Sequence, residues 1–479
     1  MAGDGEVDWK TRALPDATTR RRLLLAANDR MSAVFEAIDA APALRHGMLE
    51  PALAAIEATD FGEPVEAEAA IAELVAALAV RPGWQLHRMA FGMFTPQPIF
   101  PGVVGELIAA SMNPQLSTAE SAPVAYAIER RLIDLLGGAL GFPQGERAGH
   151  FTAGGAEANT TALIVALTRA FPDASRTGLA GLSQTPVLYV SAAGHPTWTK
   201  AARITGLGTD NLRKIATDAR GRMLAPALQA AIDADRAAGR RPLMVAATAG
   251  TTVAGEIDPL TEILAIAQRV GLYLHVDAAW GGSATLSPRA RSWFAGIEGA
   301  DSVTLDSHKW LGMPLAAGVF LSRDAAALRA AFAADSYFTD GESDDLSVSS
   351  LQWSRRANGL KLYLSLKMMG LTGFVEMIDH AIELGETLKA ALTERGWRIE
   401  NDTPLPVVCF NDPGGAAPQA IAQRLNLRGQ AFVTAMTLAG RPVLRAGIVN
   451  AKTEAADIWR LMDHLDAARR AVKPEPART

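Results

Sequence analysis

Three residues of types that take part in catalysis follow short apolar runs in this sequence. Asp277 follows Leu-Tyr-Leu-His-Val, His195 comes after Val-Leu-Tyr-Val-Ser, and Lys309 comes soon after Ser-Val-Thr-Leu. A lysine amine can attack a carbonyl carbon, a carboxylate can hold a proton on a ring nitrogen, and an imidazole can stack on a flat ring or transfer a proton. Each residue alone has a simpler explanation, as a surface lysine, a turn aspartate or a hydrogen-bonded histidine.

A glycine-rich motif adds a fourth kind of site. Residues 152–159 read Thr-Ala-Gly-Gly-Ala-Glu-Ala-Asn and open a strongly helical stretch. The N-terminus of a helix offers free N–H groups and the positive end of a dipole, which suit a phosphate. Pyridoxal phosphate needs a lysine for its aldehyde, a carboxylate for its ring nitrogen, a stacking partner for its ring and a site for its phosphate. The sequence contains all four requirements of this one cofactor.

A parallel sheet would bring these residues together. Apolar and β-branched runs predict strands at Val187–Ser191, Leu243–Ala247, Leu272–Val276, Ser302–Leu305 and Gly318–Leu321, with amphipathic helices such as Leu224–Ala238 and Leu260–Val270 between them. Strands that alternate with helices indicate parallel pairing in a three-layer α/β domain. Ligands bind at the carboxyl ends of the strands in such sheets, so Thr248, after the second run, joins the candidates.

The segments on either side of this region are expected to form separate units. Residues 16–40 and 65–80 show helical spacing of apolar residues, with Asp16 as an N-cap, but they can bury little surface on their own. A long helix at about 355–370 leads into a terminal region with its own strands and a last helix. We predict an N-terminal helical segment (1–85), a large cofactor-binding domain (86–375) and a small C-terminal domain (376–479).

Composition excludes several classes of protein. The 479 residues are 49% hydrophobic and 20% charged, which is typical of a folded globular chain, and the net charge of −5 disfavours nucleic-acid binding. No apolar run is long enough to cross a membrane, no signal peptide is recognisable, and one cysteine, Cys409, fits a reducing compartment, so we expect a cytoplasmic protein. The motifs HExxH, CxxC and GxxxxGK[ST] do not occur, so neither a metal site nor a P-loop is predicted.

Longer motifs carry a family resemblance. They are HVDAAWGGS at 275–283, DSHKWLGMP at 306–314, TAGGAEAN at 152–159, SRRANGLKLYLSLKMMG at 354–370 and GRPVLRAGIVN at 440–450. With these motifs the chain resembles the group II pyridoxal-phosphate-dependent amino-acid decarboxylases, which include the aromatic-L-amino-acid, glutamate and histidine decarboxylases. The resemblance covers nearly the whole chain.

The resemblance implies a fold and an assembly. The fold is α/β, of the aspartate-aminotransferase type (fold type I), with a three-layer α/β/α large domain, a smaller C-terminal α+β domain and an N-terminal helical segment. The assembly is an obligate homodimer, in which the N-terminal segment wraps the partner subunit and the active sites lie at the subunit interface.

The resemblance also assigns roles to residues of the predicted site. Lys309 is the Schiff-base lysine, Asp277 the partner of the ring nitrogen, and His195 the stacking residue and a proton donor. The other cofactor-binding residues are Gly155 and Ala156 at the phosphate and Thr248 and Ala279 beside the ring. His308 is expected to lie next to cofactor and substrate, and the segment 87–95 is expected to contribute His87, Met93, Phe94 and Thr95 to the substrate pocket.

A tyrosine in a polar segment completes the predicted catalytic set. Tyr337 resembles the family's loop tyrosine, which favours protonation of the carbanion after carbon dioxide leaves, and the other four tyrosines fall in predicted helices or strands. The polar segment 335–350 is therefore expected to be a mobile loop that closes over the site. Two positions depart from the family pattern. Many relatives have serine at Ala156, and Asp306 replaces an asparagine that faces the phosphate in some relatives, so Asp306 is given no phosphate contact.

The resemblance implies a carboxy-lyase that converts an L-amino acid to an amine and carbon dioxide. The alternatives are an aldehyde synthase, which couples decarboxylation to oxidative deamination, and a catalytically inactive scaffold of the same fold. The apolar residues Trp84, Phe91, Met93, Phe94 and Phe100 favour an aromatic or large apolar substrate side chain, unless they belong to the core. Arg88 and Arg356 would instead suit an acidic substrate of the glutamate or aspartate type.

Overall fold

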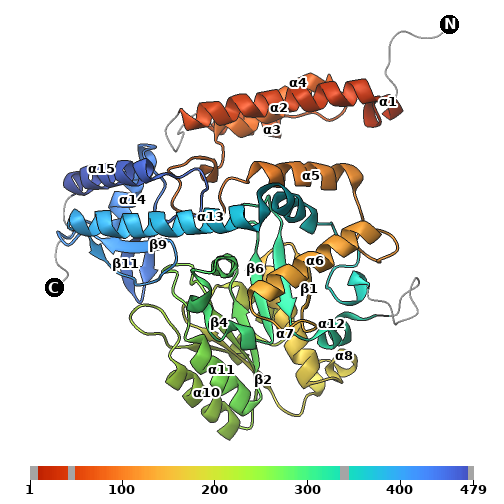
Figure 1. Cartoon of the computed structure of the whole chain (residues 1–479), viewed down its shortest axis with the longest axis vertical. Helices are drawn as coiled ribbons and strands as arrows, with labels where there is room; N and C mark the ends of the chain where they lie inside the picture. The colour runs from red at the N-terminus through yellow and green to blue at the C-terminus, as the bar shows by residue number, and fades with distance from the viewer. Residues whose placement is uncertain (1–8, 41–48, 335–344, 473–479) are drawn as a thin grey trace.

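A seven-stranded sheet forms the centre of the large domain (Figure 1). The computed structural model describes residues 9–40, 49–334 and 345–472. The strand order is β1-β7-β6-β5-β4-β2-β3, and the strands are β1 (Ala148–Thr152), β2 (Pro186–Ser191), β3 (Leu212–Ile215), β4 (Arg241–Thr248), β5 (Tyr273–Asp277), β6 (Ser302–Asp306) and β7 (Gly318–Ser322). Strands β2 to β6 pair in parallel, as the alternation of strands and helices predicts.

The direction of β7 differs from the predicted parallel pairing. This strand runs antiparallel to both of its neighbours, β1 and β6. The chain passes from Asp306 at the end of β6 to Gly318 at the start of β7, and this connection is shorter than the dozen or more residues that a parallel crossover needs. The sheet is therefore mixed, while the strands that end at Thr248, Asp277 and Asp306 remain parallel to one another.

Helices cover both faces of the sheet. Neighbouring side chains of each strand point to opposite faces, so Tyr189 and Val245 belong to one apolar core, and Leu188 and Met244 to another. The first face is covered by α6 (Pro123–Ala139), α10 (Ala225–Ala237) and α11 (Leu260–Val270), and the second by α7 (Gly155–Ala170), α9 (Thr197–Ile204) and α12 (Ala325–Phe332). This three-layer arrangement confirms the predicted fold class.

A second sheet near the C-terminus has the order β10-β11-β9-β8 and is antiparallel throughout. Its strands are β8 (Arg398–Ile399), β9 (Val407–Asn411), β10 (Thr434–Leu438) and β11 (Arg441–Gly447), and α14 (Pro418–Leu427) and α15 (Ala455–Ala471) share its core. The helix predicted at about 355–370 is the first part of α13 (Gly359–Glu394), which is kinked at Gly370, where a φ of 70° interrupts the helical geometry before a second helical part begins. The predicted domain boundary at 375 falls inside this helix.

Four N-terminal helices form a layer at one end of the molecule (Figure 1). They are α1 (Trp9–Ala13), α2 (Ala17–Asp39), α3 (Leu49–Glu57) and α4 (Ala67–Val80). Asp16 caps α2 as predicted, because its carboxylate accepts the Thr19 N–H at 2.7 Å. Within the described part of these helices, Ile38 is the only buried residue. Their apolar residues therefore remain largely exposed in the single chain.

The end of the predicted loop 335–350 is packed into the protein. Leu346 and Val348 are buried in a short 3-10 turn, and Asp345 accepts the Ala119 N–H at 2.6 Å. Residues 335–344, which include Tyr337, lie outside the described residues. The remaining helices are α5 (Phe100–Met112), which packs along α13, and α8 (Ala174–Thr177). Among the described residues, no helix is both long and apolar enough to cross a membrane.

Candidate active site

A cavity of about 260 Å³ lies at the carboxyl ends of the parallel strands. Its walls come from the ends of β4, β5 and β6, from the turn after β2 and from the first turn of α7. The cofactor-binding residues predicted from the sequence all line this cavity, together with His308: Gly155, Ala156, His195, Thr248, Asp277, Ala279 and Lys309. The fold thus gathers residues that are far apart in the sequence.

Lys309 lies in the short connection between β6 and β7. Its Nζ lies 3.0 Å from Oδ2 of Asp306, and its backbone N–H donates to the Asp306 carbonyl at 3.0 Å, so the turn that begins at Asp306 orients the amine. Asp306 is 1% exposed, and its Oδ1 has no hydrogen-bond partner among the described residues. The ion pair with Lys309 therefore balances a buried negative charge.

His308 lies on another side of Asp306. Its Nδ1 accepts the Ala317 N–H at 3.1 Å, which leaves the ring proton on Nε2, 3.7 Å from Oδ2 of Asp306. Burial lowers the pKa of His308, and the charge of Asp306 opposes this shift. The neutral ring therefore predominates at pH 7.

Asp277 is the last residue of β5 and is 5% exposed. Its Oδ1 accepts the Ala279 N–H at 3.2 Å, and its Oδ2 accepts the side-chain amide of Asn159 at 2.8 Å. Hydrogen bonds from N–H donors favour the ionised form of a carboxylate. The cavity wall thus contains a carboxylate that is fixed through both of its oxygens.

His195 lies in the turn between β2 and α9. Its Nδ1 accepts the Thr197 N–H at 3.2 Å and lies 3.2 Å from the Thr197 hydroxyl, so a neutral ring carries its proton on Nε2. Partial burial lowers the pKa of His195, while the charge of Asp277 opposes the shift. A neutral imidazole with a defined tautomer therefore forms part of the wall.

The first turn of α7 forms another wall of the cavity, opposite the strands that carry the side chains described above. Gly154 is the N-cap, and no side chain caps this helix start. The free N–H groups of the first turn can therefore bind another acceptor. A Cβ atom at Gly155 would lie 3.0 Å from Oδ2 of Asp306 and 3.4 Å from Cβ of Ala279, so glycine permits the close approach of the helix to the sheet.

Thr248 ends β4 beside this turn. Its backbone N–H donates to Oδ2 of the buried Asp258 at 2.7 Å. Its hydroxyl is buried and has no hydrogen-bond partner among the described residues. Because a buried polar group without a partner is unfavourable, this hydroxyl is available to a ligand in the cavity.

The predicted substrate-pocket residues do not line the cavity of the single chain; they are His87, Met93, Phe94 and Thr95. The backbone of this segment pairs with the small domain instead, because Phe91 N–H donates to the Phe432 carbonyl at 2.8 Å and Gly447 N–H donates to the Phe91 carbonyl at 2.7 Å. Phe94 is connected to the site through Trp280, which lines the cavity and stacks on Phe94 with ring centroids 4.1 Å apart.

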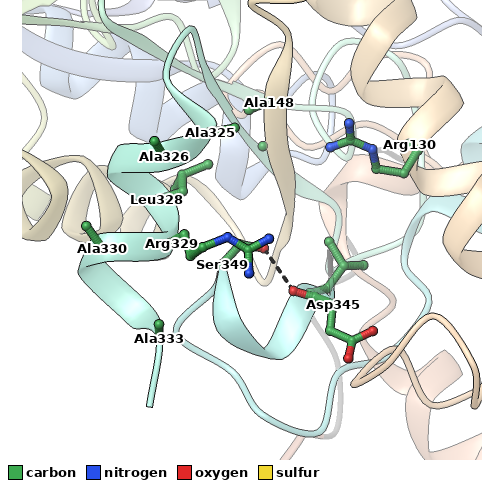
Figure 2. Close-up of a pocket in the computed structure, with 12 residues that line it drawn as sticks. Arg130, Ala148, Ala325, Ala326, Leu328, Arg329, Ala330, Ala333, Asp345 and Ser349 are labelled. Carbon is green, nitrogen blue, oxygen red and sulfur yellow. Dashed lines mark hydrogen bonds between the residues drawn. The ribbon is translucent and has the colours of Figure 1, made fainter. Parts of the chain in front are cut away.

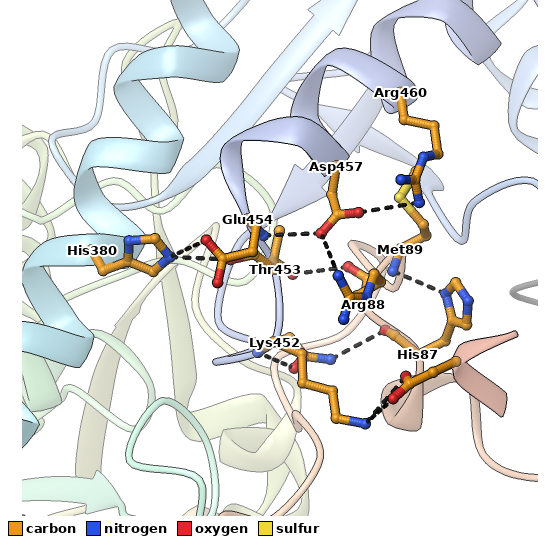
Figure 3. Close-up of polar contacts among 11 residues, drawn as sticks. His87, Arg88, Met89, His380, Lys452, Thr453, Glu454, Asp457 and Arg460 are labelled. Carbon is orange, nitrogen blue, oxygen red and sulfur yellow. Dashed lines mark hydrogen bonds and ion pairs between the residues drawn. The ribbon is translucent and has the colours of Figure 1, made fainter. Parts of the chain in front are cut away.

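The two arginines considered for an acidic substrate have other partners. Arg88 points toward Asp457 of α15, 3.8 Å away, and Figure 3 shows this pair beside His87 and Thr453. Arg356 pairs with Glu106 of α5. Neither arginine lines the cavity, because the segment that carries Arg88 is held against the small domain and Arg356 lies beside α5.

A larger cavity, of about 510 Å³, lies between α12, β1 and α6 (Figure 2). Alanine and leucine side chains form much of its wall, and its charged residues are Arg130, Arg329 and Asp345. It contains neither a lysine nor a histidine among the described residues that line it. The smaller cavity is therefore the candidate active site, because lysine, histidine and carboxylate side chains line it together.

No role was predicted from the sequence for three further residues that line the cavity, Asn159, Thr197 and Trp280. Asn159 ends the motif 152–159, and Trp280 lies in the motif 275–283, so both lay within recognisable patterns. Their contacts with Asp277 and with Phe94 join residues far apart in the chain. These contacts are visible only in the folded structure.

Comparison with known proteins identifies the family of this chain. Residues 84–412 match the family described as the pyridoxal-dependent decarboxylase conserved domain. The acidic amino acid decarboxylase GADL1 of Bos taurus is 34% identical over 64% of this chain and 60% of its own length, so this match spans less than two thirds of that relative. The aromatic-L-amino-acid decarboxylase of Bacillus atrophaeus is 30% identical over 79% of this chain and 80% of its own length.

A solved structure extends the likeness to nearly the whole fold. The structure of mouse CSAD in apo form has a TM-score of 0.87 and 27% sequence identity, and the match covers 95% of this chain and 99% of that chain. The family match, the relatives and the shared fold all point to the same family. This chain therefore belongs to the pyridoxal-dependent decarboxylase family.

Proposed function

We propose that this protein binds pyridoxal phosphate in the cavity at the strand ends and decarboxylates an L-amino acid to its amine and carbon dioxide. One observation carries the proposal: Lys309, Asp277 and His195 come from three separate segments and meet in one cavity beside the start of α7. Membership of the pyridoxal-dependent decarboxylase family supports the reaction class.

The groups in the cavity fit this cofactor. The uncapped first turn of α7 suits its phosphate, and Gly154 and Gly155 keep that wall free of side chains. The unpartnered hydroxyl of Thr248 offers a further polar contact, and Ala279 leaves room for a flat ring. The one unfavourable neighbour is Asp306, whose carboxylate lies close to Gly155 and repels an anion.

Each residue has a definite task in this proposal. When bound, pyridoxal phosphate accepts the electron pair released by the bond that breaks at the substrate Cα. Lys309 would hold the cofactor, and the carboxylate of Asp277 would keep a proton on its ring nitrogen. His195 stacks on the ring and can deliver a proton from Nε2 to the substrate carbon. The fixed hydrogen bonds of these groups keep them oriented before the reaction begins.

His308 and Tyr337 complete the proposed set as proton carriers. The proton of His308 lies on Nε2, which is 3.7 Å from Oδ2 of Asp306. Tyr337 lies outside the described residues, so its role stays a prediction from the sequence. In air, Tyr337→Phe should shift products from amine toward aldehyde, because a carbanion that is protonated more slowly reacts with oxygen. An unchanged ratio at an unchanged rate would remove Tyr337 from the proposal, and wild-type protein that already makes mainly aldehyde would favour the aldehyde-synthase alternative.

For the substrate we propose an aromatic or large apolar amino acid. The support is the stacked pair of Phe94 and Trp280, which places an aromatic surface at the wall of the cavity. Relatives of this chain carry names for both acidic and aromatic substrates, so the family alone does not choose between them.

An acidic amino acid is the second candidate, because a buried cation lies behind Phe94. The guanidinium of Arg445 lies 4.2 Å from the centre of the Phe94 ring, and its Nε and Nη2 have no hydrogen-bond partner among the described residues. Burial lowers the pKa of Arg445 to about 10, so it is still charged at pH 7. A carboxylate that reached these N–H groups would satisfy them.

We also propose that the protein is a homodimer whose active site is completed by the partner subunit. Apolar residues on α2 and α4 are exposed, including Leu24 at 53% and Leu78 at 65%. The cavity of one chain contains the predicted cofactor-binding groups but none of the predicted substrate-pocket residues. Both observations fit an assembly in which a second copy covers the helices and supplies part of the pocket. A cytoplasmic location stays a prediction.

The test is carbon dioxide release from each of the twenty amino acids by purified protein with pyridoxal phosphate. Release from aromatic or large apolar substrates alone supports the first substrate class. Release from glutamate or aspartate, lost in Arg445→Leu, supports the second. If no amino acid releases carbon dioxide while the cofactor is bound, the decarboxylase proposal is wrong.

A further inference from the structure

A buried hydrogen-bond network lies directly behind Asp277 and His195. Its centre is Asn159, which is 1% exposed and lies in the second turn of α7. The amide nitrogen of Asn159 donates to Oδ2 of Asp277 at 2.8 Å and to the hydroxyl of Thr197 at 3.2 Å. Thr197 in turn contacts Nδ1 of His195 at 3.2 Å. One amide group thus connects the two residues proposed to act on opposite parts of the cofactor ring.

The other end of the amide is fixed by two donors. Oδ1 of Asn159 accepts the hydroxyl of Thr304 at 2.8 Å and lies 3.2 Å from Nε2 of His275. Nδ1 of His275 lies 2.7 Å from the hydroxyl of Ser302. Residues 275, 302 and 304 are fully buried, so water does not compete for these bonds. An amide rotated by 180° would place its oxygen against the carboxylate of Asp277 and lose that hydrogen bond.

The hydrogen bonds that lead from Ser302 through His275 and Asn159 to Asp277 all have the same donor-to-acceptor direction. Burial lowers the pKa of His275 to about 4, so the ring is neutral at pH 7 and carries one proton. With that proton on Nε2, Ser302 donates to His275, His275 donates to Asn159, and Asn159 donates to Asp277. The titratable groups bonded to Asn159 directly or through Thr197 are Asp277, His275 and His195. Asn159 thus donates one N–H to Asp277 and the other to the Thr197 hydroxyl beside His195.

We propose that Asn159 is a positioning residue that holds the Asp277 carboxylate in one orientation and also holds the Thr197 hydroxyl beside His195. This inference rests on the proposed role of Asp277 toward pyridoxal phosphate. Asn159 itself is given no contact with the reacting atoms. Its contribution is one of the two N–H hydrogen bonds that the Asp277 carboxylate accepts.

Asn159→Asp tests this role because it keeps the shape of the side chain and makes the donor dependent on pH. Two carboxyl groups this close cannot both ionise easily, so one pKa of the pair is raised. At low pH the protonated carboxyl at 159 can still donate to Asp277, whereas at high pH it ionises, loses the donor and repels Asp277. Asn159→Leu lacks the donor at every pH.

The measurement is the dissociation constant of pyridoxal phosphate, titrated into cofactor-free protein from pH 5.5 to 8.5 and divided by the wild-type value at each pH. We expect a ratio near one for Asn159→Asp at pH 5.5 that rises about tenfold by pH 8.5, and a weakening of about tenfold for Asn159→Leu throughout. Thr161→Val is the matched control, because Thr161 is buried on the same helix and its hydroxyl has no partner among the described residues. Its ratio should stay near one.

Two results would overturn the inference. One is wild-type affinity in Asn159→Leu, and the other is a ratio for Asn159→Asp that does not change with pH, which would show a structural role alone. Failure of the proposed function looks different, because wild-type protein would then bind no pyridoxal phosphate at any pH. The ring-nitrogen ¹⁵N shift of labelled cofactor gives a second readout, since it reports whether the proton facing Asp277 is retained in each variant.

Discussion

The carboxylate of Asp277 is held in place by hydrogen bonds from neighbouring residues. Both of its oxygens accept N–H groups, from Ala279 and from Asn159, and the side chain is nearly buried. These two hydrogen bonds hold the carboxylate in one orientation at the wall of the cavity. In the proposed function, this carboxylate is the group that would hold a proton on the ring nitrogen of the cofactor.

Replacing the Asp277 carboxylate with a neutral amide keeps the shape of the side chain and removes its charge. Asp277→Asn should keep the shape of the site and retain some cofactor, but its kcat should fall by at least about a hundredfold because the ring nitrogen is no longer kept protonated. Steady-state kinetics with saturating cofactor measure the effect. Asp301→Asn is the control. Asp301 lies just before the first residue of β6, away from the cavity at the carboxyl ends of the strands, so this variant should keep nearly full kcat. Near-wild-type kcat in Asp277→Asn would mean that Asp277 is only structural.

For single residues, the sequence predicts those proposed to bind the cofactor better than those proposed to bind the substrate. Asp277 and Thr248 end parallel strands, and such ends meet at one edge of a sheet, so their place could be predicted without a structure. The segment 87–95 has no regular secondary structure to orient it, and its pairing with residues 432 and 447 depends on the small domain. Asn159 and Arg445 were missed because their significance lies in contacts distant in sequence.

At the scale of elements, strand β1 contains a buried titratable residue that the proposed mechanism does not use. His150 is fully buried, and neither ring nitrogen has a hydrogen-bond partner among the described residues. Burial lowers its pKa well below the ordinary value, and the nearby charge of Arg355 adds to the shift. The unfolded chain therefore binds a proton at His150 at a higher pH than the folded chain does.

This difference makes the large domain sensitive to acid. The stabilising contribution is present above the unfolded-state pKa of about 6.5 and is lost as the pH falls below it, by an amount on the order of 1 kcal/mol between pH 7.5 and 5.5. His150→Leu should lose less stability over that interval than the wild type, as measured by urea-unfolding midpoints. Asp258, whose pKa burial raises to about 7, acts in the opposite direction but is common to both proteins. Identical pH slopes would contradict the prediction.

Elements were predicted well wherever an apolar run is continuous. Strands β2, β4, β5 and β6 lie within two residues of their predicted ends, because strands buried on both faces read as unbroken apolar runs. The direction of β7 could not be read from its own residues, since it depends on the length of the preceding connection. The end of the segment 335–350 was predicted as a loop from its polarity, although Leu346 and Val348 are buried.

At the scale of the whole molecule, the N-terminal helices require a partner surface. We expect the purified protein to sediment at twice the chain mass of 50.5 kDa. Leu24→Glu combined with Leu78→Glu should weaken this dimer and reduce activity, because charges would be buried at an apolar interface. Leu427→Glu is the control, since Leu427 is a 59% exposed leucine on α14. A dimer and an activity unchanged by the double substitution would place the interface elsewhere.

Lys309 is the residue proposed to hold pyridoxal phosphate in the cavity at the strand ends. Borohydride reduction of the cofactor-loaded protein, followed by proteolysis and mass spectrometry, identifies the lysine that carries the cofactor. We predict one modified peptide, with the adduct on Lys309, and no stable adduct in Lys309→Ala, whereas Lys200→Ala, with an exposed lysine on α9, should give the wild-type result. An adduct on a different lysine, or none in the wild type, would contradict the account.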